Sequence, residues 1–340
     1  MTEYDINNYQ KKIISSNESS SVDVPVLLMF FNRPQQTKEV FESIKKARPS
    51  ILFLYQDGPR HLNDNDQELI LECRRIVEEI DWKCTVYTLF QETNYGCDPS
   101  GFISRKWVFS IVQKCIILED DCVPSVSFFP FCKELLDKYE NDKRIYRICG
   151  QNILGDYSPY YGDYFFTKGG SIWGWATWKR VIDEWDEEYK FLGDERIVET
   201  IRNTYKKSGI PAKRFLKTCN IHKQTNKEYF ESIFLSSRIL GSGLTIVPSK
   251  NMISNIGITN DSVHGKSNIH MYPKRIQRVF NAKRFELSFP IAEPEYVLED
   301  KKYEMTQSKI MGWNICFIKK IVIIVDELLR KLLFGRGSKK

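Results

Sequence analysis

Runs of apolar residues alternate with amphipathic segments through the first part of the chain. Short continuous apolar runs are typical of strands that are buried on both faces, and apolar residues three or four positions apart are typical of helices. The pattern predicts strands over 24–31, 51–55, 84–90 and 114–118, and helices within 32–47, 64–80, 103–111 and 127–139. This alternation predicts an α/β fold with a mostly parallel central sheet that helices flank on both faces.

The rest of the chain is less regular. Strand-like apolar runs occur at 144–150 and 243–248, an aromatic-rich stretch occupies 157–180, and helical segments continue to about residue 240. Residues 1–23 are polar and end in a serine-rich run. Such a composition buries too little apolar surface to offset the entropy of ordering, so it predicts a flexible leader.

Composition places the chain among ordinary globular proteins, with 42% hydrophobic and 28% charged residues. The formal net charge of +6, from 50 basic and 44 acidic residues, is too small and too mixed to indicate a nucleic-acid-binding protein. Nine scattered cysteines include no C-x-x-C pair, so neither a zinc site nor a thioredoxin motif is indicated. Because no uncharged apolar run approaches the ~20 residues that span a bilayer and no signal peptide is evident, we expect a cytoplasmic protein with reduced thiols.

Polar turns follow three of the predicted strands at the edge where parallel α/β sheets bind ligands, the carboxyl ends of the strands. They are Asn32-Arg33-Pro34, Gln56-Asp57-Gly58 and Glu119-Asp120-Asp121. Each turn alone is explained by the residues that turns require. Together they place an arginine suited to phosphate, an aspartate suited to a base or ribose, and carboxylates suited to a metal on one edge. This grouping predicts a nucleoside-diphosphate pocket.

The acidic triplet stands at the exit of a buried strand. Three successive carboxylates raise one another's pKa by like-charge repulsion, and a divalent cation with a preference for oxygen ligands, Mg²⁺ or Mn²⁺, resolves that conflict. Alternation along an extended chain predicts Glu119 and Asp121 on one side and Asp120 on the other. The alternative is that these acids solvate a turn and favour the N-terminus of the following helix.

Three tryptophans are interleaved with glycines and small residues over 169–178. Indole rings suit stacking on a sugar face, and neighbouring glycines permit close approach of backbone to ligand. Trp173, Gly174 and Trp175 are therefore candidates for contact with a sugar or an acceptor. The alternative is that this cluster belongs to the hydrophobic core.

Five segments of the sequence together resemble one family. They are VLLMFFNRPQQT, FLYQDGPR, IILEDDCVPSVSFFPFC, SIWGWATWKR and IVPSKNMISNIG. Over roughly residues 24–265, the chain resembles bacterial nucleotide-sugar glycosyltransferases of the GT-A fold, which are related to the N-acetylglucosaminyltransferase I type and are sometimes labelled hemolytic-protein-like. The resemblance implies the GT-A fold, a donor such as a UDP-sugar, an Mn²⁺ or Mg²⁺ ion, and an inverting displacement.

The resemblance also implies roles for individual residues. Asp121 would hold the metal, and Glu119 and Asp120 would contact the ribose and the sugar of the donor. Arg33 and Asp57 would contact the nucleotide. The expected donor site is completed by Asn32, Gly58 and Asn94.

The general base and a second metal ligand rest on the same resemblance. Related sequences carry an aromatic-Asp-Tyr segment before the helix that precedes the strand at 243–248, and this chain instead reads Asn226-Lys227-Glu228-Tyr229-Phe230-Glu231. Glu228 occupies the expected base position, and Glu231 competes with it. His264 is a candidate metal ligand because many GT-A enzymes supply a late histidine, although a solvated loop histidine explains it equally well.

The expected organisation is a leader (1–23), a GT-A domain (24–265), a basic extension (266–305) that closes over the sheet edge, and an amphipathic basic helix (306–340). Such a helix suits docking on an anionic membrane surface through 313–340, packing on the catalytic domain, or pairing with another copy.

The sequence thus predicts a metal-dependent glycosyltransferase that uses a nucleotide-sugar donor and a glycan or lipid-linked glycan acceptor. The setting would be bacterial O-antigen or capsule synthesis, in the cytoplasm or on the inner face of the cytoplasmic membrane. One alternative is a sugar-nucleotide nucleotidyltransferase, although the first strand is followed by Asn32-Arg33-Pro34 and not by the glycine-rich loop of that class. The other is a non-catalytic sugar-binding protein of the same fold.

Overall fold

The computed structural model describes residues 6–61, 63–206, 208–225, 227–258 and 269–313. The strands are β1 (Gln10–Ile14), β2 (Val22–Phe30), β3 (Pro49–Gln56), β4 (Cys84–Phe90), β5 (Lys114–Glu119), β6 (Cys122–Pro124), β7 (Ile145–Cys149), β8 (Tyr164–Thr167), β9 (Trp175–Trp178), β10 (Leu244–Pro248) and β11 (Ile253–Asn255). The helices are α1 (Pro34–Ala47), α2 (Asp64–Val77), α3 (Cys97–Ile111), α4 (Phe128–Lys138), α5 (Lys179–Ile182), α6 (Glu195–Thr204), α7 (Ala212–Thr225), α8 (Phe230–Leu240), α9 (Lys274–Gln277) and α10 (Lys301–Met311), with short 3-10 turns η1 (Lys190–Gly193) and η2 (Ile269–Met271).

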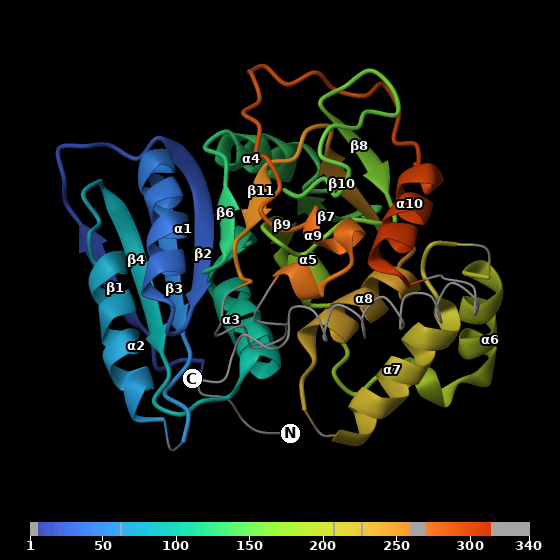
Figure 1. The fold of residues 1–340 in the computed structure, drawn as a ribbon, viewed down its shortest axis with the longest axis horizontal. Helices are drawn as coiled ribbons and strands as arrows, with labels where there is room; N and C mark the ends of the chain where they lie inside the picture. The colour runs from blue at the N-terminus through green and yellow to red at the C-terminus, as the bar shows by residue number, and fades with distance from the viewer. Residues whose placement is uncertain (1–5, 62, 207, 226, 259–268, 314–340) are drawn as a thin grey trace.

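Most of the described strands join one nine-stranded sheet in the order β1-β4-β3-β2-β5-β9-β7-β10-β8, and β6 pairs with β11 in a separate small sheet (Figure 1). The central strands of the large sheet are buried on both faces, as the continuous apolar runs predict. The predicted α/β class is therefore confirmed.

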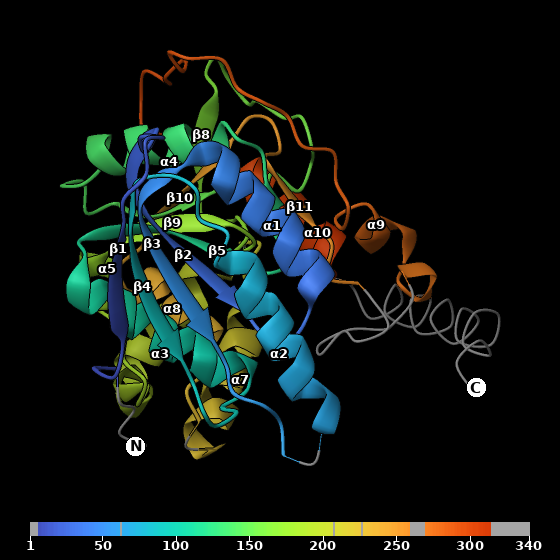
Figure 2. The same cartoon turned by 90° about the vertical axis from the view of Figure 1, so that its left-hand side faces the viewer.

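The first half of the sheet follows the predicted alternation of strands and helices. β4, β3, β2 and β5 are parallel neighbours. The chain moves outward from β2 to β4 through α1 and α2, and then returns past β2 to β5 through α3. Since such crossovers are right-handed, the return places α3 on the opposite face from α1 and α2 (Figure 2).

The second half of the sheet is mixed, so the predicted mostly parallel sheet is right only for the first half. β9 lies antiparallel between β5 and β7, and β8 lies antiparallel beside β10, whereas β7 and β10 are parallel. β7, β8 and β9 follow one another along the chain with no described helix between them. The βαβ unit that imposes parallel pairing is therefore missing here.

The leader is also different from the prediction. Gln10–Ile14 form β1, which pairs antiparallel with β4 at the open edge of the sheet. The ring of Tyr9 lies 5.8 Å from that of Tyr87 and 6.1 Å from that of Trp107. A polar segment can take this place because edge pairing uses backbone groups and leaves most side chains in water.

The described part of the basic extension packs against the small sheet. The amide of Phe285 donates to the Asn251 carbonyl at 2.8 Å, and the Glu286 carboxylate accepts from the amides of Val126 and Ser127 at 3.0 and 2.7 Å. The helix predicted over 306–340 has other bounds in the described residues: α10 begins at Lys301, within the predicted extension, and ends at Met311, because Gly312 takes a left-handed φ of +73° that stops the helix. Residues 314–340 lie outside the described ranges. Across the described residues, no helix has both the length and the apolar character needed to cross a bilayer.

Candidate functional site

The carboxyl ends of β2, β3 and β5 lie side by side because these strands are parallel neighbours. The three predicted turns therefore meet at one edge of the sheet. We call the residues 31–33, 57–60 and 119–121 at this edge the rim.

Arg33 faces two carboxylates of the triplet at the rim. Its Nη1 lies 3.3 Å from Asp121 Oδ2 and 3.7 Å from Asp120 Oδ1. Asp120 also accepts from the amide of Phe31 at 3.2 Å, and Asp121 Oδ1 accepts from Asn255 Nδ2 at 3.1 Å. Burial raises the pKa of Asp120 well above its usual range; Arg33 opposes this shift, and the charge of Asp121 adds to it. One guanidinium thus serves two partly buried acids.

Glu119 has a separate partner. Arg105 of α3, which has no exposed surface, directs Nη2 to Glu119 Oε1 at 3.3 Å and Nη1 to the Gly101 carbonyl at 2.8 Å. Burial raises the pKa of Glu119 to about 7; Arg105 opposes this shift, while the charges of Asp121, Glu231 and Asp120 favour it.

The salt bridges divide the triplet differently from the predicted alternation, because Asp120 and Asp121 both face Arg33 while Glu119 faces Arg105. β5 ends at Glu119, so strand alternation does not extend to the next two residues. Among these carboxylates, Asp121 still acts most strongly on the pKa of Glu119.

The carboxylates of Asp120 and Asp121 can supply part of the ligand set of a hard cation. No group of three or more His, Cys, Asp or Glu side chains within the described ranges is arranged to hold a metal ion. Mg²⁺ and Mn²⁺ are commonly bound by one or two protein carboxylates, with substrate phosphates and water as the other ligands. Asp121 with Asp120 can supply such a set. His264 lies outside the described residues.

Asp57 holds two loops of the protein together. Its Oδ1 accepts from the amides of Gly58 and Tyr95 at 3.0 and 2.9 Å, and its Oδ2 accepts from the amide of Gly96 at 2.8 Å. Asn94 Nδ2 donates to the Gly58 carbonyl at 2.8 Å. A Cβ on Gly58 would stand 2.6 Å from the backbone of Thr93, so this close approach requires glycine. Three of the predicted donor contacts thus join the loop after β3 to the loop after β4.

Asn32 is fixed by a residue that the sequence did not single out. Its Nδ2 donates to Asp66 Oδ1 at 2.7 Å, and Arg60 binds the same carboxylate through Nε and Nη2 at 2.7 and 2.6 Å. Arg60 holds the pKa of Asp66 below its usual range. Asp66 of α2 therefore ties the loop after β2 to the loop after β3.

The tryptophan cluster belongs in part to the core. Trp175 has no exposed surface and packs 5.0 Å from the ring of Phe234, so it cannot stack on a sugar as predicted. Gly174 is also buried, with φ of +63°, and a Cβ there would lie 2.4 Å from Ile253. Trp173 remains half-buried, 4.8 Å from Phe280, and it lines a cavity.

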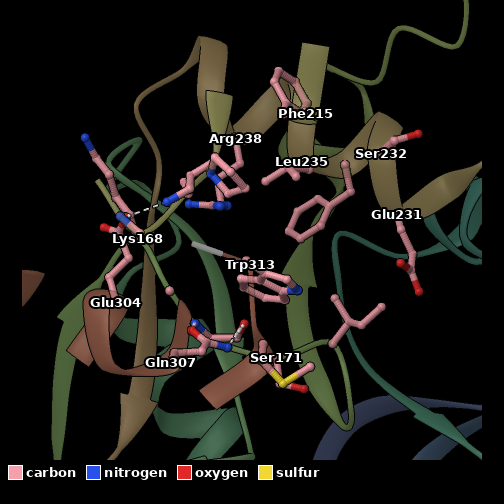
Figure 3. A pocket seen from close by; sticks show the side chains of 18 of the residues that line it. Lys168, Ser171, Phe215, Glu231, Ser232, Leu235, Arg238, Glu304, Gln307 and Trp313 are labelled. Carbon is pink, nitrogen blue, oxygen red and sulfur yellow. Dashed lines mark hydrogen bonds between the residues drawn. The ribbon is translucent and has the colours of Figure 1, made fainter. Parts of the chain in front are cut away.

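This cavity, of about 450 Å³, lies between the second half of the sheet and the helices α7, α8 and α10 (Figure 3). Glu231, at the start of α8, lines it, and the charge of Glu231 contributes to the raised pKa of Glu119. Glu228 is buried and lines a different cavity of about 370 Å³, together with His222 and Lys227. The two base candidates thus line different cavities, both of which His222 borders, and the charge of Glu231 is the one that acts on Glu119 at the rim.

Besides Asp66 and Arg60, four further residues were missed by the sequence interpretation: Arg105, Arg147, Arg238 and Asn255. Arg147 occurs within the apolar strand RIYRICG, and Arg238 occurs within the apolar helix FESIFLSSRIL. An arginine inside an apolar run is a usable signal, because a buried charge needs a partner.

Comparison with known proteins gives little. No family model matches the chain, and no curated protein matches it. Among solved structures, the chain is similar to the apo-form glycosyltransferase GlyE of Streptococcus pneumoniae TIGR4, with 14% identity and a TM-score of 0.26. The match covers 55% of this chain and 39% of that chain, so less than half of GlyE's length is spanned. A likeness this weak supports no argument about activity.

Proposed function

We propose that the protein is a metal-dependent glycosyltransferase that moves a sugar from a nucleotide-diphosphate donor to a glycan acceptor. The observation that carries the proposal is the rim, where Arg33 lies 3.3 Å from Asp121 and 3.7 Å from Asp120 at the carboxyl end of a parallel strand. The sequence resemblance of these same turns to GT-A glycosyltransferases supports it. Residues 24–265 would form the catalytic domain.

In this proposal the rim binds the donor, for which UDP-sugars are favoured. Arg33 is suited to a phosphate of the donor, and Glu119 to a hydroxyl of the ribose or the sugar. Asp121, with Asp120 beside it, would hold Mn²⁺ or Mg²⁺, and the bound ion would stabilise the departing diphosphate. Asp57 would act by shaping the pocket, since its carboxylate accepts three backbone N–H bonds.

Glu231 is the better candidate for the general base. It lines the large cavity, and it lies near enough to the rim to influence the Glu119 charge. A base must reach the acceptor hydroxyl beside the donor sugar, and a carboxylate between donor and acceptor sites meets that requirement. Glu228, which is 6% exposed and lines the other cavity, does not.

The acceptor would be a glycan or lipid-linked glycan of a bacterial surface polysaccharide, O-antigen or capsule. The enzyme would work in the cytoplasm, with residues 313–340 as a contact to the inner face of the membrane. The inverting outcome is part of the same proposal and rests on the resemblance alone.

The experiment is a donor screen on the full chain. UDP release from a panel of UDP-sugars is measured by mass spectrometry, with and without MnCl₂, for the wild type and Asp121→Ala. Metal-dependent release that Asp121→Ala abolishes supports the proposal. Sugar binding without turnover of any nucleotide-sugar would contradict it and favour the non-catalytic alternative, and formation of a nucleotide-sugar from sugar phosphate would favour the nucleotidyltransferase.

A further inference from the structure

Two arginines are buried at the large cavity although neither belongs to the rim. Arg147 lies in β7. Arg238 lies in α8, and Figure 3 shows it at the cavity. Each is 5% exposed, and both line the cavity. Burial of a guanidinium is costly unless its charge and its N–H groups are satisfied.

The hydrogen bonds that these arginines make in the described part of the chain leave most of their donors unused. Arg147 Nη2 donates to the Gly169 carbonyl and to Thr245 Oγ1, both at 3.1 Å, and its Nε is buried without a partner. Arg238 Nη1 donates to the Gly243 carbonyl at 3.5 Å, a long contact. Because a guanidinium carries five N–H donors, each arginine has capacity for a further acceptor.

Charge at the cavity is also unbalanced. No carboxylate of the described residues forms an ion pair with Arg147 or Arg238, whereas the buried Arg105 has Glu119. Glu304 lines the cavity, but its Oε1 accepts from the amides of Gly209 and Ile210 at 2.6 and 3.2 Å. The basic side chains that line the cavity are Arg147, Lys168, Arg214 and Arg238, and the acidic ones are Glu231 and Glu304. Lys168 pairs with Glu299, outside this lining, at 4.0 Å, so the unbalanced charge is that of the arginines.

Burial lowers the pKa of both guanidiniums. The pKa of Arg147 falls to about 10, and the charge of Arg238 adds to this effect. The charges of Glu304 and Glu299 oppose the shift at Arg238. Both arginines remain charged at neutral pH, so two like charges share a buried site. A bound anion removes this repulsion and also fills the unused donors.

The apolar and aromatic part of the cavity lining suits a small sugar. Trp173, Phe215, Leu235 and Trp313 supply apolar and aromatic surface. In Figure 3 the indole of Trp313 lies across the middle of the cavity, between Arg238 and Ser171. A volume of about 450 Å³ is within the range of small-molecule sites.

We propose that this cavity binds an anionic group of the acceptor, a phosphate or a carboxylate, through the guanidiniums of Arg147 and Arg238, which both line it. The assignment to an acceptor rests on the proposed glycosyltransferase function, because Glu231 would stand between this cavity and the donor at the rim. The acceptor class is then an acidic or phosphorylated sugar.

The test uses the full-length chain and three probes in isothermal titration at low ionic strength: glucose 6-phosphate, glucuronate and glucose. At least one charged sugar is expected to bind about tenfold or more tightly than glucose, since ion-paired hydrogen bonds are among the stronger polar contacts. Preference for glucose 6-phosphate identifies a phosphate, and preference for glucuronate identifies a carboxylate. Equal affinity for all three probes would overturn the inference.

A variant pair tests the place of binding. Leu235 lines the cavity three residues before Arg238 on α8, where side chains are neighbours on one helix face. Leu235→Glu supplies a carboxylate to the arginines and is expected to weaken binding of the charged sugar at least about tenfold, whereas the uncharged Leu235→Gln changes it less than about threefold. Equal affinities in the two variants, with unchanged circular dichroism, would place the anion elsewhere and overturn the proposal.

UDP titration in parallel keeps this inference apart from the proposed function. Arg33→Met is expected to weaken UDP binding about tenfold or more. Charged-sugar binding in a protein that does not bind UDP would contradict the donor site and leave the anion site standing. UDP binding without any preference for charged sugars would support the donor site and contradict the anion site.

Discussion

The rim and the large cavity have opposite charge balances. The rim holds four carboxylates, those of Asp57, Glu119, Asp120 and Asp121, and two guanidiniums, those of Arg33 and Arg60. The cavity is lined by four basic side chains and two acidic ones. An excess of carboxylate suits a cation with its bound diphosphate, and an excess of guanidinium suits an anion. This difference supports the two ligands that we propose, a metal-bound diphosphate at the rim and an anionic group in the cavity.

The two regions also differ in the contacts that hold them in place. Rim residues follow strands that pair with their neighbours, and hydrogen bonds that the carboxylates of Asp57 and Asp66 accept tie their loops together. The cavity is enclosed by helices that pack on the mixed half of the sheet (Figures 1 and 3). Four predictions test this difference.

The largest effect is expected where the two regions meet. Glu231→Gln removes a proton acceptor with little change of shape, so kcat for sugar transfer should fall about 1000-fold, as general-base catalysis typically contributes 10²–10⁴. The matched Glu228→Gln should lower kcat less than about threefold, because Glu228 lines the other cavity. Steady-state kinetics with one donor and one acceptor measure kcat for both variants. A larger loss of kcat in Glu228→Gln than in Glu231→Gln would assign the general base to Glu228.

At the rim, Asp121→Asn should lower Mn²⁺-dependent kcat/KM about 100-fold, since loss of a charged metal ligand removes several kcal/mol of transition-state stabilisation. Asp137→Asn is a suitable control, because Asp137 is an exposed carboxylate on α4 that pairs with lysines away from the rim. An equal loss of activity in Asp121→Asn and Asp137→Asn would contradict the proposal that Asp121 binds the metal.

The third prediction compares two buried arginines by their effect on the free energy of unfolding. Arg105→Met leaves Glu119 without its partner and should cost about 2 kcal/mol, less than the ~3–5 for a fully buried pair, because the Glu119 side chain is 30% exposed. Arg147→Met removes a buried charge that has no carboxylate partner among the described residues, so the free energy of unfolding should stay within about 1 kcal/mol of wild type. Urea unfolding without ligands measures the free energy of unfolding of both variants. Equal losses of stability would mean that the charge of Arg147 is stabilised by its surroundings as well as that of Arg105.

The smallest effect is expected at the support of the rim. Arg60 lowers the pKa of Asp66, so the ionised carboxylate stabilises the fold above its unfolded pKa of about 3.9, and this contribution is lost as pH falls through the folded value. Asp66→Asn should therefore cost about 1 kcal/mol at pH 7, a figure reduced by the exposure of Arg60, and progressively less on acidification below about pH 4. Unfolding measured over a pH series tests this, and a loss that did not vary with pH would assign the effect to packing alone.

The elements of the first half could be predicted because each leaves a local pattern. Buried parallel strands are continuous apolar runs, and the helices between them are amphipathic, so β2 to β5, α1, α2 and α4 lie close to their predicted bounds. α3 begins at Cys97, ahead of the predicted start at 103. β1 was not predicted, because an edge strand is held by backbone pairing and needs no apolar run. No strand was predicted in the aromatic stretch that holds β8 and β9, since the antiparallel insertion of β9 between β5 and β7 leaves no pattern along the chain.

The α/β class, the three polar turns and the acidic triplet could be read from the amino-acid sequence, because each depends on residues that are close together along the chain. The division of the triplet between Arg33 and Arg105, the binding of backbone amides by Asp57 and the burial of Trp175 could be seen in the folded structure alone. It alone brought Arg147 and Arg238 together at one cavity. Charge pairing and burial depend on which distant segments meet, and that contact is set by packing of the whole sheet and its helices.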